Sequence, residues 1–112
     1  MLILYGIKQC DTVAKARRWL ETNGRDYRFH DFRVDGLGRD LLERFERAVG
    51  WELLLNRRGT TWRQLPEPRR AEPDREGTLA LMLEYPALIK RPVLDAGDRI
   101  LVGFSPVSYG EL

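Results

Sequence analysis

The sequence predicts an α/β fold with a mixed four-stranded sheet, built from a βαβ half and a ββα half with a helical insert between them. An apolar run at residues 1–5 has the length of a strand, residues 27–32 read as a second strand, and a segment with helical periodicity separates the two. Near the end of the chain, residues 92–95 and 99–102 read as short strands that flank a turn containing glycine. These observations predict a parallel strand pair in the first half and an antiparallel hairpin in the second.

The chain has 112 residues, of which 43% are hydrophobic and 32% charged, as in an ordinary globular domain. We expect a single domain spanning residues 1–112, and a monomer. No apolar run is long enough to cross a bilayer, and a net charge of +2 is too balanced to indicate a nucleic-acid surface, so neither a membrane nor a nucleic acid is an expected partner. The lone cysteine, with no export signal before it, predicts a location in the reducing cytoplasm.

The first helix is predicted by an apolar stripe at spacings of three and four residues, formed by Val13, Ala16 and Leu20. Asp11 or Thr12 can cap its start, and Gly24 can end it. Because this helix connects two strands, we expect those strands to be parallel.

We expect the helical insert to span about residues 36–85. An apolar stripe through residues 37–49 predicts its first helix, which stops at Gly50, and a further helical turn is expected over residues 51–55.

Residues 56–75 contain three prolines and a glycine, so we expect mostly loop there, with Trp62 and Leu65 tucked inward. A last helix of the insert is expected over residues 77–84, where Pro86 ends it.

After the predicted hairpin, Ser105 followed by Pro106 is typical of an N-cap and the first residue of a helix. We expect this helix to run to the C-terminus. The resulting order, β-α-β, helical insert, β-β-α, is typical of the thioredoxin-like arrangement.

Cys10 lies where the first strand gives way to the first helix, and this position carries most of the functional signal. The N–H groups and the dipole of a helix start favour an anion there. A free cysteine is only roughly 3% thiolate at pH 7, so such a position favours the reactive form of the thiol. Lys8 adds a nearby positive charge, whereas Asp11 opposes it. The same helix start suits a small oxyanion or a substrate carboxylate.

The alternative is that Cys10 is a small buried hydrophobic residue without chemistry. Position 13 is valine, so the chain has no Cys-x-x-Cys pair. Turnover at Cys10 would pass through a mixed disulfide resolved by an outside thiol, for which glutathione is the expected co-substrate. We expect no bound cofactor and no metal, because one cysteine excludes a multi-cysteine site. His30, the only histidine, lies in a predicted strand and is expected to be structural.

Three segments of the chain closely resemble the arsenate reductase-related (ArsC/Spx) family: residues 4–12 (LYGIKQCDT), 29–33 (FHDFR) and 88–93 (LIKRPV). Residues 56–62 (NRRGTTW) and 101–104 (LVGF) resemble its YffB branch. The resemblance spans essentially the whole chain, and it implies a thioredoxin-like fold with a helical insert.

The resemblance also implies that Cys10 is the nucleophile and that Arg91 precedes a cis proline, Pro92, facing it. An arginine in that place would hold the thiolate and a bound oxyanion. The residues expected to border the bound substrate are Lys8, Asp11, Thr12 and Pro92.

Arsenate reductases of the family take a second arginine from the insert and a third late in the chain. Asn56 occupies the second position, so either Arg57 or Arg58 joins the substrate site or the role is lost. The third position falls near Gly103 and Phe104 and lacks an arginine. These departures argue against efficient arsenate reduction. They favour a glutathione-dependent thiol reductase that acts on a small oxyanion or a thiol/disulfide substrate.

A second functional class is open, because some relatives in the family are adaptors that bind RNA polymerase through a Cys-x-x-Cys switch. Val13 removes that switch. This disfavours a redox-gated adaptor but leaves a constitutive adaptor as the alternative to an enzyme.

Overall fold

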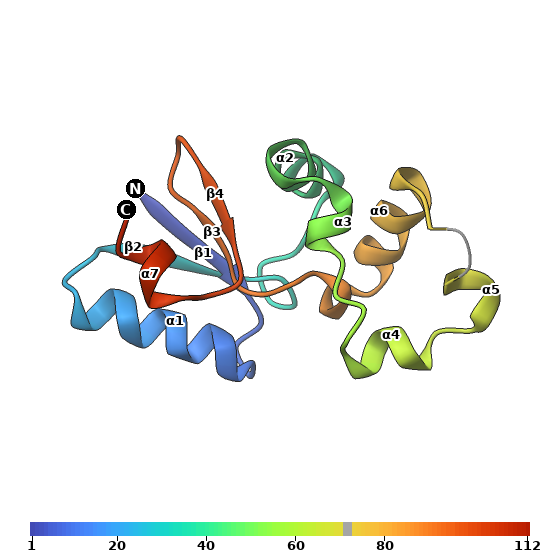
Figure 1. Ribbon diagram of the computed structural model, residues 1–112, viewed down its shortest axis with the longest axis horizontal. Helices are drawn as coiled ribbons and strands as arrows, with labels where there is room; N and C mark the ends of the chain where they lie inside the picture. The colour runs from blue at the N-terminus through green and yellow to red at the C-terminus, as the bar shows by residue number, and fades with distance from the viewer. Residues whose placement is uncertain (71–72) are drawn as a thin grey trace. The chain divides into compact units, whose positions relative to one another are not determined.

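The computed structural model describes residues 1–70 and 73–112 and separates into two compact units (Figure 1). The sheet unit comprises Met1–Gly36 and Arg91–Leu112, and the helical unit comprises Leu37–Lys90. The helical unit covers the region in which the insert was expected. That the whole chain forms a single domain stays a prediction.

The sheet unit is built from β1 (Leu2–Gly6), α1 (Asp11–Thr22), β2 (Tyr27–Asp31), β3 (Val93–Asp95), β4 (Ile100–Val102) and α7 (Pro106–Tyr109). Its strands lie in the order β2-β1-β3-β4. β1 is parallel to β2 and antiparallel to β3, and β3 forms a hairpin with β4. The predicted α/β class with a mixed four-stranded sheet is therefore confirmed.

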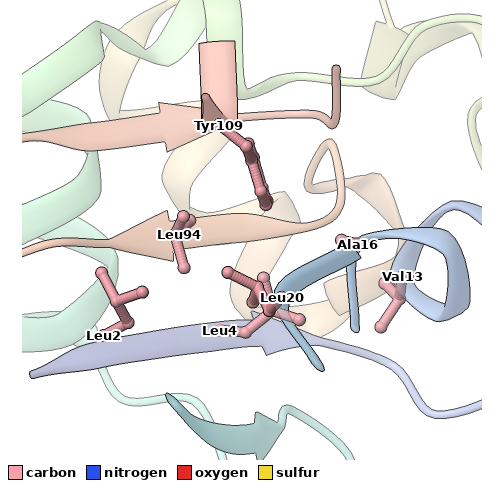
Figure 2. Packing of buried hydrophobic residues seen from close by; sticks show 7 residues of the cluster. All are labelled: Leu2, Leu4, Val13, Ala16, Leu20, Leu94 and Tyr109. Atoms are coloured by element: carbon pink, nitrogen blue, oxygen red, sulfur yellow. The ribbon is translucent and has the colours of Figure 1, made fainter. Parts of the chain in front are cut away.

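The core of the sheet unit lies on one face of the sheet, between the strands and the helices α1 and α7 (Figure 2). Its members are Leu2 and Leu4 of β1, Leu94 of β3, Val13, Ala16 and Leu20 of α1, and Tyr109 of α7. The ring of Tyr109 meets the rings of Trp19 and Phe104 edge-on, with centroids 5.6 and 4.9 Å away. Burial raises the pKa of Tyr109 above its ordinary value. The apolar stripe read from the sequence is thus the face of α1 that packs on the sheet.

Cys10 is the N-cap of α1, so the prediction that Asp11 or Thr12 caps this helix was wrong. The chain turns into the helix at Cys10, whose carbonyl accepts the N–H of Ala14 at 3.0 Å. Asp11 and Thr12 therefore already lie in the first turn. The other end follows the prediction, because Gly24 adopts a φ of +66° directly after the C-cap, a conformation that favours glycine.

α7 begins as the sequence predicts, with Ser105 as its N-cap and Pro106 as its first residue. The hydroxyl of Ser105 accepts the N–H of Ser108 at 3.1 Å. The helix ends at Tyr109 after one turn, so the prediction that it runs to the C-terminus was wrong. Gly110 is a poor helix former, and too few residues follow it to propagate the helix.

The helical unit consists of α2 (Arg39–Val49), α3 (Trp51–Leu54), α4 (Thr60–Gln64), α5 (Glu67–Arg70), α6 (Arg75–Glu84) and the 3-10 turn η1 (Pro86–Leu88). Gly50 ends α2 with a φ of +86°, and Pro86 ends α6, as predicted. Leu65 is buried and Trp62 is half-buried, also as predicted. In the described part of the chain, no helix combines the length and the apolar character needed to cross a membrane.

The prediction of a loop over most of residues 56–75 was wrong, because α4 and α5 form there. The prolines that suggested a loop are compatible with short helices. Pro66 lies just before α5 and Pro68 lies in its first turn, where a missing N–H group breaks no helical hydrogen bond. Residues 71–72 of the expected loop lie outside the described residues.

One buried carboxylate holds the loop between β1 and α1. Asp31, at the end of β2, accepts the N–H of Lys8 at 3.0 Å and the N–H of Arg33 at 2.8 Å. Burial of Asp31 acts to raise its pKa, but the backbone N–H groups of Arg33, Lys8 and Val34 outweigh this and hold the pKa of Asp31 below its ordinary value. The loop that carries Cys10 is therefore tied to β2 by hydrogen bonds to a charged group.

Replacing Asp31 with asparagine should lower the free energy of unfolding at pH 7 by about 2 kcal/mol, within the range for hydrogen bonds to a charged group. Because the folded pKa is depressed, the contribution of Asp31 is fully present above the unfolded pKa of about 3.9 and is lost as the pH falls through the folded value. Urea unfolding between pH 7 and pH 3 should show a difference between wild type and Asp31→Asn that narrows in acid.

Asp26→Asn, which changes an exposed carboxylate, is the matched control and should leave the free energy of unfolding nearly unchanged. A loss at pH 7 no larger for Asp31→Asn than for Asp26→Asn would contradict the role given to Asp31.

Candidate active site

The thiol of Cys10 is placed by the start of α1. Cys10 is half-buried, makes no capping hydrogen bond with its side chain and packs against the edge of the sheet-unit core. Within the described residues, the N–H groups of Asp11, Thr12 and Val13 have no hydrogen-bond acceptor. These free N–H groups and the helix dipole form a positively polarised end at which a thiolate or another anion is stabilised.

The residue three positions after Cys10 belongs to the core. Val13 is fully buried, and its side chain lies so close to Gly6 that a Cβ added there would meet Val13 Cγ2 at 2.7 Å. Only glycine at position 6 allows the end of β1 and the first turn of α1 to approach this closely. The contact brings the Cys10 loop tightly onto the end of the strand.

The peptide bond between Arg91 and Pro92 is cis, which confirms the prediction made from the family resemblance. Pro92 is buried, and its carbonyl accepts the N–H of Gly103 at 2.8 Å. The antiparallel register pairs Val93 with Tyr5. This register places the Arg91–Pro92 peptide at the end of β1 from which the Cys10 loop departs.

Arg91 is half-buried and, among the described residues, has no ion-pair partner. A guanidinium without a carboxylate partner is available for an anion. Its contact with the thiolate or with substrate stays a prediction.

Lys8, Asp11 and Thr12 all have exposed side chains on the loop and first turn around Cys10. The backbone of Lys8 is held by Asp31, while its ammonium group is free to move toward an anion. The structure therefore brings Lys8, Asp11 and Thr12 together with Cys10, and the substrate contacts expected of them stay predictions.

Arg57 and Arg58 lie in the helical unit, on the loop between α3 and α4, and both are exposed. Asn56, which stands in the family's arginine position, has a structural task in this loop. Its side-chain oxygen accepts the N–H of Arg58 at 3.1 Å. Asn56 thus shapes the turn that presents Arg57 and Arg58, and the binding of an anion by either arginine stays a prediction.

Asp31 is the residue of the site that sequence reasoning missed. The sequence shows Asp31 only as one residue of a predicted strand, and its contact with the distant N–H of Lys8 appears in the structure alone. His30 is structural as expected, with its Nε2 atom 2.7 Å from the carbonyl oxygen of Gly36. Within residues 1–70 and 73–112, no cluster of His, Cys, Asp and Glu side chains could hold a metal ion.

Comparisons with known proteins agree with this arrangement. The profile of the ArsC family matches residues 5–112. An uncharacterised protein of Haemophilus influenzae is 42% identical over 109 residues, which cover 97% of this chain and 96% of the relative.

Two solved structures are also similar along their whole length. A protein described as YffB is 47% identical with a TM-score of 0.95, and the match covers 99% of this chain and 97% of the other. An arsenate reductase (ArsC) related protein of Brucella melitensis is 49% identical with a TM-score of 0.81, covering 98% and 92%. The fold is thioredoxin-like, and the chain belongs to the ArsC family, in its YffB-like branch.

Proposed function

We propose that the protein is a glutathione-dependent thiol–disulfide reductase in which Cys10 is the nucleophile. The observation that carries the proposal is the position of the Cys10 thiol, half-exposed at the start of α1 beside N–H groups that have no acceptor. Such a position offers N–H donors to an anion, and the thiolate is the form of cysteine that attacks a disulfide. Membership of a family that includes reductases supports the same reaction class.

The reaction proceeds by two exchanges. In the first, the Cys10 thiolate attacks the glutathione sulfur of a mixed disulfide between glutathione and a substrate thiol, forms a Cys10–glutathione disulfide and releases the substrate thiolate. In the second, the thiolate of a second glutathione attacks the glutathione sulfur of the Cys10–glutathione disulfide, releases the Cys10 thiolate and forms glutathione disulfide. The net reaction converts the substrate mixed disulfide and one glutathione into a substrate thiol and glutathione disulfide.

The resolving thiol must come from outside the chain, because Cys10 is the only cysteine and position 13 is a buried valine. Glutathione suits this role in a reducing compartment, and we place the protein in the cytoplasm on the same reasoning. The reaction needs no bound cofactor, and a monomer carries every group that it uses.

Arg91 and the helix start would hold the anionic groups of the substrate. A guanidinium provides paired N–H donors for a carboxylate or an oxyanion. The exposed ammonium group of Lys8 adds charge at the same end of the sheet. Glutathione carries carboxylates and a thiol, so one arginine and one helix start can position it.

Incubation of the wild-type protein with glutathione disulfide should add one glutathione to Cys10, and an excess of reduced glutathione should remove it. Mass spectrometry of the intact protein measures both steps. The Cys10→Ser variant should gain no glutathione. An unmodified wild-type protein under conditions that modify the urea-unfolded chain would overturn the proposal and favour the adaptor alternative.

Arsenate reduction with glutathione should be poor or undetectable. Removing one donor from an oxyanion site costs roughly 100- to 1000-fold in rate, and this chain has Asn56 and Gly103-Phe104 where family reductases place arginines.

Arg91→Ala should slow the exchange with glutathione disulfide about tenfold or more, the loss expected for one charged hydrogen bond.

Arg99→Ala, which removes an exposed arginine of the same unit, is the control for the change in net charge and should leave the exchange rate unaltered. Efficient arsenate turnover by the wild type, or equal effects of the two arginine variants, would contradict these roles.

A further inference from the structure

A hollow of about 280 Å³ lies within the helical unit. Its lining residues are Glu52, Leu55, Arg57, Arg58 and Lys90. Ligand pockets range upward from roughly 300 Å³, so this hollow has room for one end of a small ligand.

Backbone hydrogen bonds build the hollow from two segments that are far apart in the sequence. Leu55 and Ile89 form a β-bridge. The N–H of Asn56 donates to the carbonyl of Leu88, and the N–H of Lys90 donates to the carbonyl of Leu54, both at 2.7 Å. The backbone that carries the cationic side chains is therefore set by the fold before any ligand arrives, which lowers the entropic cost of binding.

The side chain of Asn56 shapes the loop further. Besides accepting the N–H of Arg58, it lies so close to Gly59 that a Cβ added there would meet the Asn56 amide at 2.9 Å. The ring of Trp62 lies 5.8 Å from the guanidinium carbon of Arg57, at the distance of a cation–π contact. The side chain of Asn56 thus stabilises the turn, and the ring of Trp62 packs near the guanidinium group of Arg57.

The charges in the hollow are unbalanced. Three cations face one carboxylate, that of Glu52. In the described part of the chain, Arg57, Arg58 and Lys90 have no ion-pair partner.

Other arginines of the same unit are satisfied within the fold. Ion pairs join Arg39 to Glu76, Arg69 to Glu84 and Arg75 to Glu46. The cations of the hollow differ from these three arginines in having no ion-pair partner among the described residues, and a cluster with an excess of positive charge attracts an anion.

We propose that Arg57, Arg58 and Lys90 form a binding site for the carboxylate of a small anionic peptide. The identity of that peptide as glutathione rests on the proposed function. The planar fork of an arginine guanidinium matches the geometry of a carboxylate, and the ammonium group of Lys90 adds a further donor. The site recognises the ligand by its charged end and makes no use of its sulfur.

The test uses the Cys10→Ser variant and S-methylglutathione, which cannot exchange disulfides, so binding is measured without chemistry. Titration followed by NMR should shift the backbone amide signals of Arg58 and Gly59. Arg58→Ala and Lys90→Ala should each weaken binding about tenfold or more, as expected for a lost charged hydrogen bond. Arg63→Ala removes an exposed arginine of the same unit outside the hollow and should not change the affinity.

Two further ligands test whether the site recognises the carboxylate of a peptide or any anion. The diethyl ester of S-methylglutathione lacks free carboxylates and should not bind. Sodium sulfate at equal ionic strength should compete only weakly. Equal binding of the ester, sulfate binding as tight as that of the peptide, or equal effects of the three variants would each overturn the site.

Failure of this site is distinguishable from failure of the proposed function. If the wild type exchanges with glutathione disulfide at Cys10 but S-methylglutathione causes no shift at Arg58 or Gly59, the carboxylate site is wrong and the reductase proposal stands. If S-methylglutathione binds as described but Cys10 does not exchange, the site stands as a peptide-carboxylate site and the reductase proposal is wrong.

Discussion

The close packing of Val13 on Gly6 is the contact on which the arrangement around Cys10 depends. It brings the first turn of α1 against the end of β1, so that the loop between them is short and Cys10 becomes the N-cap of the helix. Asp31 holds the same loop from the neighbouring strand through the N–H of Lys8. A strand end, a helix start and a buried carboxylate together determine where the thiol lies.

The groups that can stabilise an anion next to Cys10 belong to the backbone more than to side chains. The N–H groups at the start of α1 are present because no helix can satisfy its own first turn, and no side chain caps them. A side-chain cap from Asp11 or Thr12 would have filled the place that an anion can occupy. Arg91 enters the same end of the sheet through the pairing of β3 with β1. The helical unit contributes a separate group of cations that its own backbone holds in place.

Much of the fold could be predicted from the sequence, because strand-length apolar runs and the Val13, Ala16, Leu20 stripe reflect burial directly. The prediction of a cis peptide bond before Pro92 rested on the family resemblance, and the structure confirms it. The helices over residues 60–70 could not be predicted, since proline and glycine mark helix starts as well as loops. The role of Asp31 was also hidden, because a carboxylate in a strand does not reveal which distant N–H groups it will meet. The sequence also indicated Asp11 or Thr12 as the N-cap of the first helix, whereas the structure has Cys10 there, without a capping hydrogen bond from its side chain.

We infer that the folded structure makes Cys10 a more reactive thiol than the same residue in an unstructured chain. The most direct test is the rate of iodoacetamide alkylation at pH 7, measured on the native protein and on the protein unfolded in urea, with a short cysteine peptide in both solvents to correct for urea. The sequence is the same in both states, so the ratio of the corrected rates reports the effect of the helix start and its surroundings. We expect the native thiol to react several-fold faster, even though it is half-buried. A native rate equal to or below that of the unfolded chain would show that Cys10 is a packing residue and would contradict its role as a nucleophile.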